Sequence, residues 1–250
     1  MARRDRPLRC SSHHHGPAGK SSGQTGAGRM SGPDVVLHGH FESGNVYKVT
    51  LLLALTGTAY DYRHVDIFAG ETRDDNFTAL NTFQEVPVLE HGGTVVTQSD
   101  VILRYLADQL GRFGGKNEDE QRRVQEWMAW SSNKLINGIS QARFGSRWAN
   151  YDPATITFFQ NRARAAFDLM DRHLADHPWL VGDEPTIADL SAAGYIYLVN
   201  EAGLDTTAWR NMLSWMGRLS VLPGWHHPDK LPQKNAIVAP TVTFDAPADD

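Results

Sequence analysis

The chain has 250 residues, of which 41% are hydrophobic and 21% charged, a balance typical of globular proteins and not of disordered ones. The formal net charge is -5, but residues 1–30 hold six basic residues against one acid, so the remaining body carries -10. An acidic body without a basic patch argues against nucleic acid as a partner, and no apolar run approaches the roughly 20 residues of a membrane span.

Cysteine usage limits the chemistry that the body can perform. The only cysteine, Cys10, lies in the basic leader. The body therefore contains no disulfide, no cysteine nucleophile and no cysteine-based metal site, which suits a reducing, cytoplasmic compartment. We expect any thiol chemistry there to use a thiol carried by a small molecule, and we expect no bound metal.

Residues 1–33 are rich in Arg, Ser, Gly and Pro and are predicted to be disordered. Three interpretations of this leader remain open. The run His13-His14-His15 is typical of a purification tag, the Arg/Ser-rich composition is typical of a transit peptide, and Met30 is a third candidate, as the true start. The last is favoured, because regular periodicity begins just after Met30.

The first half of the body alternates strand and helix patterns. A short apolar strand is followed by a helix that starts near Ser43 and ends at Gly57, and later a His-Gly-Gly turn joins two short strands. The predicted elements are strands at 35–38, 60–67, 86–89 and 94–97, and helices at 43–56, 72–80 and 99–110. The order β-α-β-α-β-β-α predicts a four-stranded mixed sheet.

Beyond a Gly-rich break at 111–117, strand signals vanish, and helices are predicted at 118–145, 153–177, 186–203 and 207–222. The fold class is therefore α/β plus all-α. The expected domains are a small α/β domain over 34–112, a helical domain over 118–225, and a mobile or surface-bound tail over 226–250.

Three motifs carry possible chemistry. A proline entering a strand, as in Val86-Pro87, belongs at a sheet edge, or, if its peptide bond is cis, at a bend that leaves the Val86 main chain open to an extended ligand. Gln98-Ser99-Asp100 precedes a helix, so that Ser99 is either a plain N-cap or part of an anion site. Ser43 likewise either caps its helix or, together with the helix end, stabilises a ligand thiolate.

The order and spacing of these motifs resemble the glutathione transferase family. The motifs are Ser43-Gly44-Asn45, Leu80-Asn81, Glu85-Val86-Pro87, Gln98-Ser99-Asp100 and, in the helical half, Thr186-Ile187-Ala188-Asp189. The resemblance spans about residues 34–225 and implies a thioredoxin-like N-terminal domain followed by an all-helical domain. It also implies glutathione as co-substrate, a homodimer, and a structural capping box at Thr186 and Asp189.

The resemblance also implies roles for individual residues. Ser43 would be the thiolate partner, with Asn45 as a second donor. Val86, across a cis Pro87, would pair with the cysteinyl backbone of glutathione. Gln98 and Ser99 would hold its γ-glutamyl end, with Asp100 beside them. Two departures weaken the match: Asn81-Thr82-Phe83-Gln84 replaces the family's Asn-Pro-x-Gly, and Gln98 stands where glutamate is commoner.

Outside the motifs, His38 and His40 are candidates for a general base or for packing, and Arg143 and Arg147 for binding an acidic electrophile or for surface solvation. The expected function is transfer of glutathione to a small electrophile. A glutathione-dependent isomerase and a disulfide reductase are alternatives, and so is a non-catalytic glutathione-binding or dimerisation module.

Overall fold

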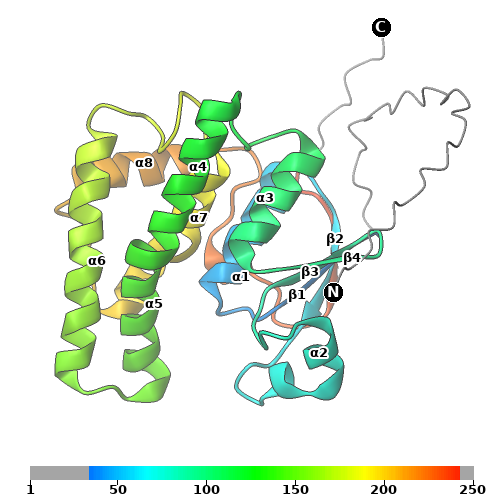
Figure 1. The fold of residues 1–250 in the computed structure, drawn as a ribbon. Coiled ribbons are helices and arrows are strands. Elements are labelled where there is room, and N and C mark those ends of the chain that lie inside the picture. The colour runs from blue at the N-terminus through cyan, green and yellow to red at the C-terminus, as the bar shows by residue number, and fades with distance from the viewer. Residues whose placement is uncertain (1–33, 243–250) are drawn as a thin grey trace, which may run out of the picture.

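The computed structural model describes residues 34–242. The predictions for residues 1–33, and for the last eight residues of the tail, lie outside the described residues. Figure 1 shows a sheet with its helices on one side of the molecule and a bundle of helices on the other. This is the predicted combination of an α/β domain and a helical domain, and the fold-class prediction is confirmed.

The α/β part follows the predicted order of elements. Its strands and helices are β1 (Val35–Gly39), α1 (Gly44–Leu55), β2 (Tyr60–His64), α2 (Asp75–Leu80), β3 (Val88–His91), β4 (Thr94–Thr97) and α3 (Ser99–Leu110). The strands lie in the order β4-β3-β1-β2-β5, with β1 parallel to β2 and antiparallel to β3. The parallel pair arises because α1 crosses over between β1 and β2.

The tail adds a strand that the sequence analysis missed. Residues Ala236–Val238 form β5, which pairs antiparallel with β2 and places Val238 opposite Tyr60. The expectation of a four-stranded sheet followed only by helices is therefore wrong. A three-residue strand between prolines carries no periodic signal, and it forms because the edge of β2 offers unpaired main-chain groups.

The helical part consists of α4 (Glu118–Trp130), α5 (Asn137–Phe144), α6 (Pro153–Leu174), α7 (Ile187–Ile196) and α8 (Arg210–Ser220). The helix predicted at 118–145 is interrupted by a π-helical segment at Ser131–Ile136 that links α4 to α5. Side-chain oxygens of Asn117 and Asp152 cap α4 and α6, which explains where these two helices begin.

Helix α7 joins the two halves. All ten of its residues are buried, as expected for a helix that is apolar on every side. It packs against α1 so closely that a Cβ at Gly44 would lie 2.4 Å from the carbonyl oxygen of Gly194, and one at Gly194 would lie 2.9 Å from that of Gly44. One continuous core includes apolar side chains of both halves, so the start of α1 is held rigidly against the helical domain.

Candidate functional site

Three loops that carry the predicted site residues meet at one end of the sheet. Val88 of β3 pairs with His38 of β1 on one side and with Thr97 of β4 on the other. The segments that follow His38, precede Val88 and follow Thr97 therefore leave the sheet at the same end of its strands. They carry, respectively, Ser43 with Asn45, Val86 with Pro87, and Gln98 with Ser99 and Asp100.

Ser43 occupies the N-cap of α1, as predicted. Its backbone is extended, and its Oγ accepts a hydrogen bond of 3.3 Å from the Val46 N–H. Gly39, where β1 ends, has no room for a side chain, because a Cβ there would lie 2.6 Å from Val46. Ser43 and Asn45 are both half-buried, and the Asn45 side chain makes no hydrogen bond within the described part of the chain.

A residue that the sequence analysis did not single out packs against the start of α1. Tyr195, on α7, is 8% exposed, and its ring lies against Gly44, since a Cβ at Gly44 would be 2.7 Å from two ring carbons. Burial raises the pKa of Tyr195, whereas the Arg143 charge, the Ser43 hydroxyl and the N–H groups of Asn45 and Gly44 lower it. No sequence signal marks Tyr195, because its partners lie about 150 positions away in an otherwise apolar helix.

The second loop presents an open main chain. The Val86–Pro87 peptide bond is cis, Pro87 is buried and Val86 is half-buried. Asn81 shapes the turn before it, donating from Nδ2 to the Glu85 carbonyl at 2.8 Å and accepting from the Phe83 N–H at 3.0 Å. Among residues 34–242 the Val86 N–H and C=O have no hydrogen-bond partner. These groups are positioned to bind an extended, peptide-like molecule.

At the third loop, the prediction that Ser99 caps α3 is wrong by one residue. Gln98 holds the N-cap position with φ 66° and ψ 114°, and the helix begins at Ser99 without a side-chain cap. The Gln98 Nε2 instead donates to Glu85 Oε2 at 3.0 Å. The backbone turns one residue earlier than the cap signal indicates. The half-buried Ser99 hydroxyl therefore has no hydrogen-bond partner among the residues described.

Asp100 links several helices. Its Oδ1 pairs with the buried Lys48 of α1 at 2.6 Å and accepts from Ser191 of α7 at 2.8 Å, while Ser132 donates to its Oδ2. Burial by itself would raise the pKa of the Asp100 carboxyl, but the Lys48 charge and these hydrogen bonds hold that pKa below its usual value. Asp100 is therefore ionised and anchors α3 to α1 and α7.

Comparison with known proteins agrees with this arrangement. The chain matches the models described as "Glutathione S-transferase, N-terminal domain" over residues 33–108 and "Glutathione S-transferase, C-terminal domain" over residues 145–225. It is 30% identical over 196 residues to glutathione S-transferase GstB of Escherichia coli K12, a match covering 76% of this chain and 94% of that protein. The chain belongs to the glutathione S-transferase family.

Solved structures of family members have the same fold. A glutathione S-transferase from Xanthobacter autotrophicus is 33% identical with a TM-score of 0.72, and the match covers 77% of this chain and 95% of that one. A glutathione S-transferase from Pseudomonas fluorescens is 29% identical with a TM-score of 0.75, covering 78% and 99%. The resemblance stated from the motifs alone is thus confirmed.

His38 and His40, the two candidates for a general base, both interact with neighbouring parts of the α/β domain. His38 Nε2 lies 2.7 Å from Glu90 Oε1 across the sheet, on the strand and not in the loop. His40 is buried, with Nδ1 3.0 Å from the Val65 carbonyl oxygen and Nε2 3.8 Å from Glu42 Oε2. His40 thus fixes the loop that leads into α1, and neither imidazole hydrogen-bonds to Ser43 among the described residues.

Two arginines near the start of α1 are paired with acids. Arg143, 5% exposed, donates to the Glu42 carbonyl at 2.7 Å and to Glu201 at 2.8 Å. Arg147 donates to Glu42 at 2.9 Å and also pairs with Glu201. Two acids therefore balance two arginines. This charge balance does not support the expectation that these arginines select an acidic electrophile.

Aromatic rings line the same region. The guanidinium groups of Arg143 and Arg147 lie 4.9 and 4.7 Å from the ring centre of Trp148, and Phe68, which is 50% exposed, lies 5.3 Å from that ring. Phe68 comes from the loop after β2 and Trp148 from the end of the helix pair α4–α5. Each domain therefore contributes one ring to this contact, and Phe68 also lies 5.3 Å from the ring of His40 in the loop before α1.

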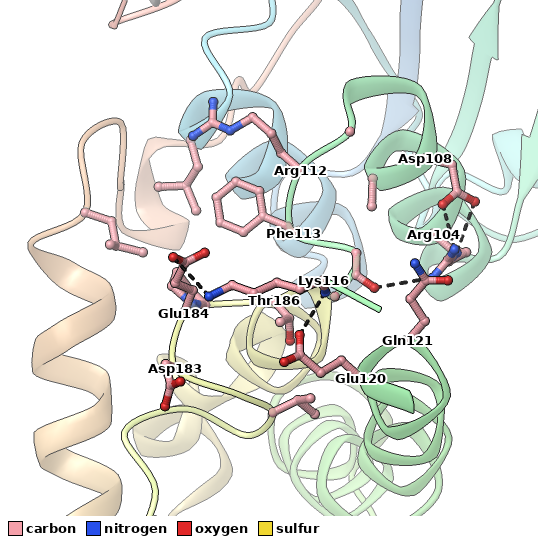
Figure 2. Close-up of a pocket in the computed structure, with 18 of the residues that line it drawn as sticks. Arg104, Asp108, Arg112, Phe113, Lys116, Glu120, Gln121, Asp183, Glu184 and Thr186 are labelled. Atoms are coloured by element: carbon pink, nitrogen blue, oxygen red, sulfur yellow. Dashed lines mark hydrogen bonds and ion pairs between the residues drawn. The ribbon is translucent and has the colours of Figure 1, made fainter. Parts of the chain in front are cut away.

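A cavity of about 670 Å³ lies between the domains at a different place, near the C-terminal ends of α1 and α3. Figure 2 shows two pairs of oppositely charged side chains there: Lys116 with Glu184 at 3.3 Å, and Arg104 with Asp108 at 2.7 Å. Its lining includes Leu55, at the opposite end of α1 from Ser43. This cavity is distinct from the candidate site.

Two structural features are absent from residues 34–242. No helix there is long and apolar enough to span a bilayer. The same residues contain no group of three or more His, Cys, Asp or Glu side chains placed to hold a metal ion.

Proposed function

We propose that this chain is a glutathione transferase that binds glutathione along the three converging loops, stabilises its thiolate at Ser43 and transfers the sulfur to a small electrophile. The observation that carries the proposal is the convergence itself. The Ser43 hydroxyl at the start of α1, an open main chain at Val86 and an unpaired hydroxyl at Ser99 lie at one end of the sheet. Glutathione is a tripeptide with one thiol and two carboxylates, and these groups match that set.

In this arrangement the Val86 N–H and C=O pair with the cysteinyl unit of glutathione as an added strand would, beside Pro87. Gln98 and the Ser99 hydroxyl hold the γ-glutamyl end. Its carboxylate is favoured by the start of α3, where main-chain N–H groups lack helical partners. Asp100 lies next to this end, and its ion pair with Lys48 holds the start of α3 in place for it.

Ser43 lowers the thiol pKa by donating a hydrogen bond to the thiolate. A shift of one pKa unit corresponds to about 1.4 kcal/mol. A hydrogen bond to a charged group contributes about 1.5–3 kcal/mol, and the positive end of α1 adds about 0.3–1 kcal/mol. Together they bring the thiol pKa close to neutrality. Asn45, whose side chain is unpaired, is the second donor.

The surroundings of Ser43 also favour one class of electrophile. Phe68 and Trp148 offer ring faces, and the adjacent arginines are neutralised by Glu42 and Glu201. Apolar, uncharged compounds, aryl halides among them, therefore fit this surface better than anionic ones. Removal of such compounds is a detoxification reaction, and a cytoplasmic location would supply the reduced glutathione that it consumes.

A homodimer is the proposed assembly. Large apolar side chains are exposed on the α/β domain, with Phe83 58% and Val101 55% exposed. Phe83 precedes Val86 in the same loop, and Val101 lies in the first turn of α3, so this surface adjoins the glutathione loops. Replacing both residues by serine should shift the sedimentation of the protein from dimer to monomer. A dimer that persists would place the interface elsewhere.

The decisive experiment titrates enzyme-bound glutathione by its thiolate absorbance in wild type and Ser43→Ala. We expect the thiol pKa to rise by about one to two units in the variant, equivalent to the loss of about 1.5–3 kcal/mol. Glutathione should still bind, because Val86, Gln98 and Ser99 remain. Coincident titrations with activity retained would contradict the role of Ser43, and Asn45→Ala would then be tested. Binding without turnover on a panel of aryl halide, maleyl-ketone and glutathionyl-disulfide substrates would favour a non-catalytic module.

A further inference from the structure

The residues that follow the helical domain form a closed strap across the α/β domain. At the start of this strap, residues 226–242, the Tyr47 hydroxyl of α1 donates to the His226 carbonyl at 2.8 Å. The strap then pairs with the sheet as β5 and returns to its own beginning, since a Cβ at Gly224 would lie 3.0 Å from Val242. It begins where the matched C-terminal family model ends, so that model does not account for it.

The strap encloses a second cavity, of about 410 Å³, against the end of α1 and the start of β2. This volume lies in the range of about 300–1,000 Å³ that is typical of small-molecule sites. The cavity shares no lining residue with the larger cavity between the domains. Its walls are mostly apolar and include Ala54 of α1, Tyr60 of β2, and Leu231, Val238 and Ala239 of the strap.

Tyr60 supplies an unused hydrogen-bond donor to this cavity. The residue is only 4% exposed, and its hydroxyl has no hydrogen-bond partner among residues 34–242. The hydroxyl oxygen of Tyr62, the next residue on the same face of β2, is wholly buried, whereas that of Tyr60 keeps accessible surface. Burial raises the pKa of Tyr60, so its hydroxyl keeps the proton that it can donate.

The main-chain acceptors at the end of α1 are already used. Three successive carbonyl groups accept at 2.8–3.1 Å from the N–H groups of residues 56–58, and the Thr58 hydroxyl lies 2.9 Å from that of Thr56. The end of the helix therefore offers a ligand few free acceptors. Its unsatisfied partner on this wall is the donor at Tyr60.

Lys230 is the only lining residue with a full charge. Its Nζ lies 3.9 Å from Asp229 Oδ2, which is too long for a hydrogen bond, and both side chains are exposed. Burial lowers the pKa of His226, which also lines the cavity, so this imidazole is neutral at neutral pH. The lining thus combines apolar walls with a phenol donor and a cation, and it contains no carboxylate.

From this combination we infer that the strap cavity binds a small apolar carboxylate. Its hydrocarbon part fills the cavity, Tyr60 donates to the carboxylate, and Lys230 supplies the opposite charge. The site is separate from the glutathione loops, because Ala54 and Tyr60 lie at the ends of α1 and β2 that are remote from Ser43. The inference does not depend on the proposed function.

The test is calorimetry of the full-length protein with octanoate. We expect saturable one-to-one binding with a Kd below about 1 mM. Octylammonium, which has the same chain and the opposite charge, should bind at least about tenfold more weakly. Tyr60→Phe should weaken octanoate binding by about tenfold, because a hydrogen bond to a carboxylate is lost. Lys230→Met should weaken it by about threefold, since the lysine is exposed.

Two matched controls test whether these effects are local. Tyr62→Phe removes a neighbouring hydroxyl that does not line the cavity, and Lys234→Met removes an exposed charge elsewhere on the strap. Both should bind octanoate as wild type does. Ala239→Trp, at an exposed lining residue just after β5, should fill the cavity and abolish octanoate binding while glutathione binding is unchanged.

Four outcomes would overturn the inference: no saturable binding of octanoate, equal affinity for octylammonium, wild-type affinity in both Tyr60→Phe and Ala239→Trp, or displacement of octanoate by glutathione. The last would place octanoate in the glutathione site. None of them would affect the proposed function, which is measured by glutathione binding and thiolate titration. Conversely, a protein that binds octanoate but no glutathione would overturn only the proposed function.

Discussion

The N-termini of α7 and α3 differ in whether side chains of the protein bind their first main-chain N–H groups, which have no partner within the helix. At α7, Thr186 caps the helix, and Asp189 accepts from the Thr186 N–H at 2.9 Å, the Leu180 N–H at 3.0 Å and Trp215 Nε1 at 2.8 Å. At α3 no side chain caps the helix, and the residue before it has a positive φ. A fully satisfied helix end stabilises the fold, whereas an open one is available to a ligand.

The start of α1 lies between these extremes. Ser43 caps it weakly, at 3.3 Å, and the ring of Tyr195 from the other domain packs against Gly44. The three helix ends therefore differ in how much of their hydrogen-bonding capacity the protein itself uses. Substitutions should accordingly change stability at α7, chemistry at α1 and affinity at α3.

The largest effect is expected for Asp189→Ala. The carboxylate is fully buried. Burial raises its pKa, and the four hydrogen bonds that it accepts lower the pKa but do not cancel the effect of burial. Its loss leaves buried donors at Leu180, Thr186 and Trp215 unpaired, at about 1–3 kcal/mol each if no water enters. We expect the free energy of unfolding to fall by about 4 kcal/mol in urea titrations. A loss below about 1 kcal/mol would mean that α7 does not depend on its capping box.

Asp100→Asn should have the next largest effect, because it leaves the buried Lys48 without a counter-charge. We expect a loss of about 2–3 kcal/mol, below the ~3–5 of a fully buried pair, since Asp100 is partly exposed. The pKa of Asp100 is lowered in the fold, so its contribution is present above its unfolded pKa of about 3.9 and disappears as pH falls through the folded pKa. The stability gap between wild type and variant should therefore narrow below about pH 4. A gap independent of pH would exclude the ion pair as its source.

A substitution at Gln98 tests the uncapped N-terminus of α3, and its expected effect on stability is smaller. Its positive φ is a conformation that only glycine adopts without strain, at a cost of about 1 kcal/mol or more for other residues. Gln98→Gly should therefore be about 1 kcal/mol more stable than Gln98→Ala in thermal unfolding. Both variants lose the same side chain, so their affinities for glutathione should fall equally. Unequal affinities would show that the backbone, and not the amide, contacts the ligand.

The smallest effect on stability is expected for Ser99→Ala. Because Ser99 makes no capping hydrogen bond, we expect the free energy of unfolding to change by no more than about 0.5 kcal/mol. The affinity for glutathione should nevertheless fall about tenfold, as calorimetry would measure, since one hydrogen bond to a carboxylate is lost. Unchanged affinity in the folded variant would remove Ser99 from the site.

Much of the fold follows directly from the sequence. Strand and helix periodicity places β1 to β4 and α1 to α3 of the α/β domain, because each buried face must repeat along the chain. The caps at Ser43, Asn117, Asp152 and Thr186 are local, since a helix end is satisfied by a residue beside it. Motif spacing along the chain was likewise sufficient to indicate the family.

Only the tertiary structure decided the features that depend on residues far apart in sequence. The strand β5 forms because β2 offers an edge, Arg143 pairs with Glu201 and donates to the Glu42 carbonyl, and Asp100 is held by Lys48. Tyr195 reaches the start of α1 only because α7 packs against Gly44. The local sequence pattern predicts the secondary structure of a segment. The hydrogen-bond partner of a buried polar group depends instead on which surfaces the folded chain brings together.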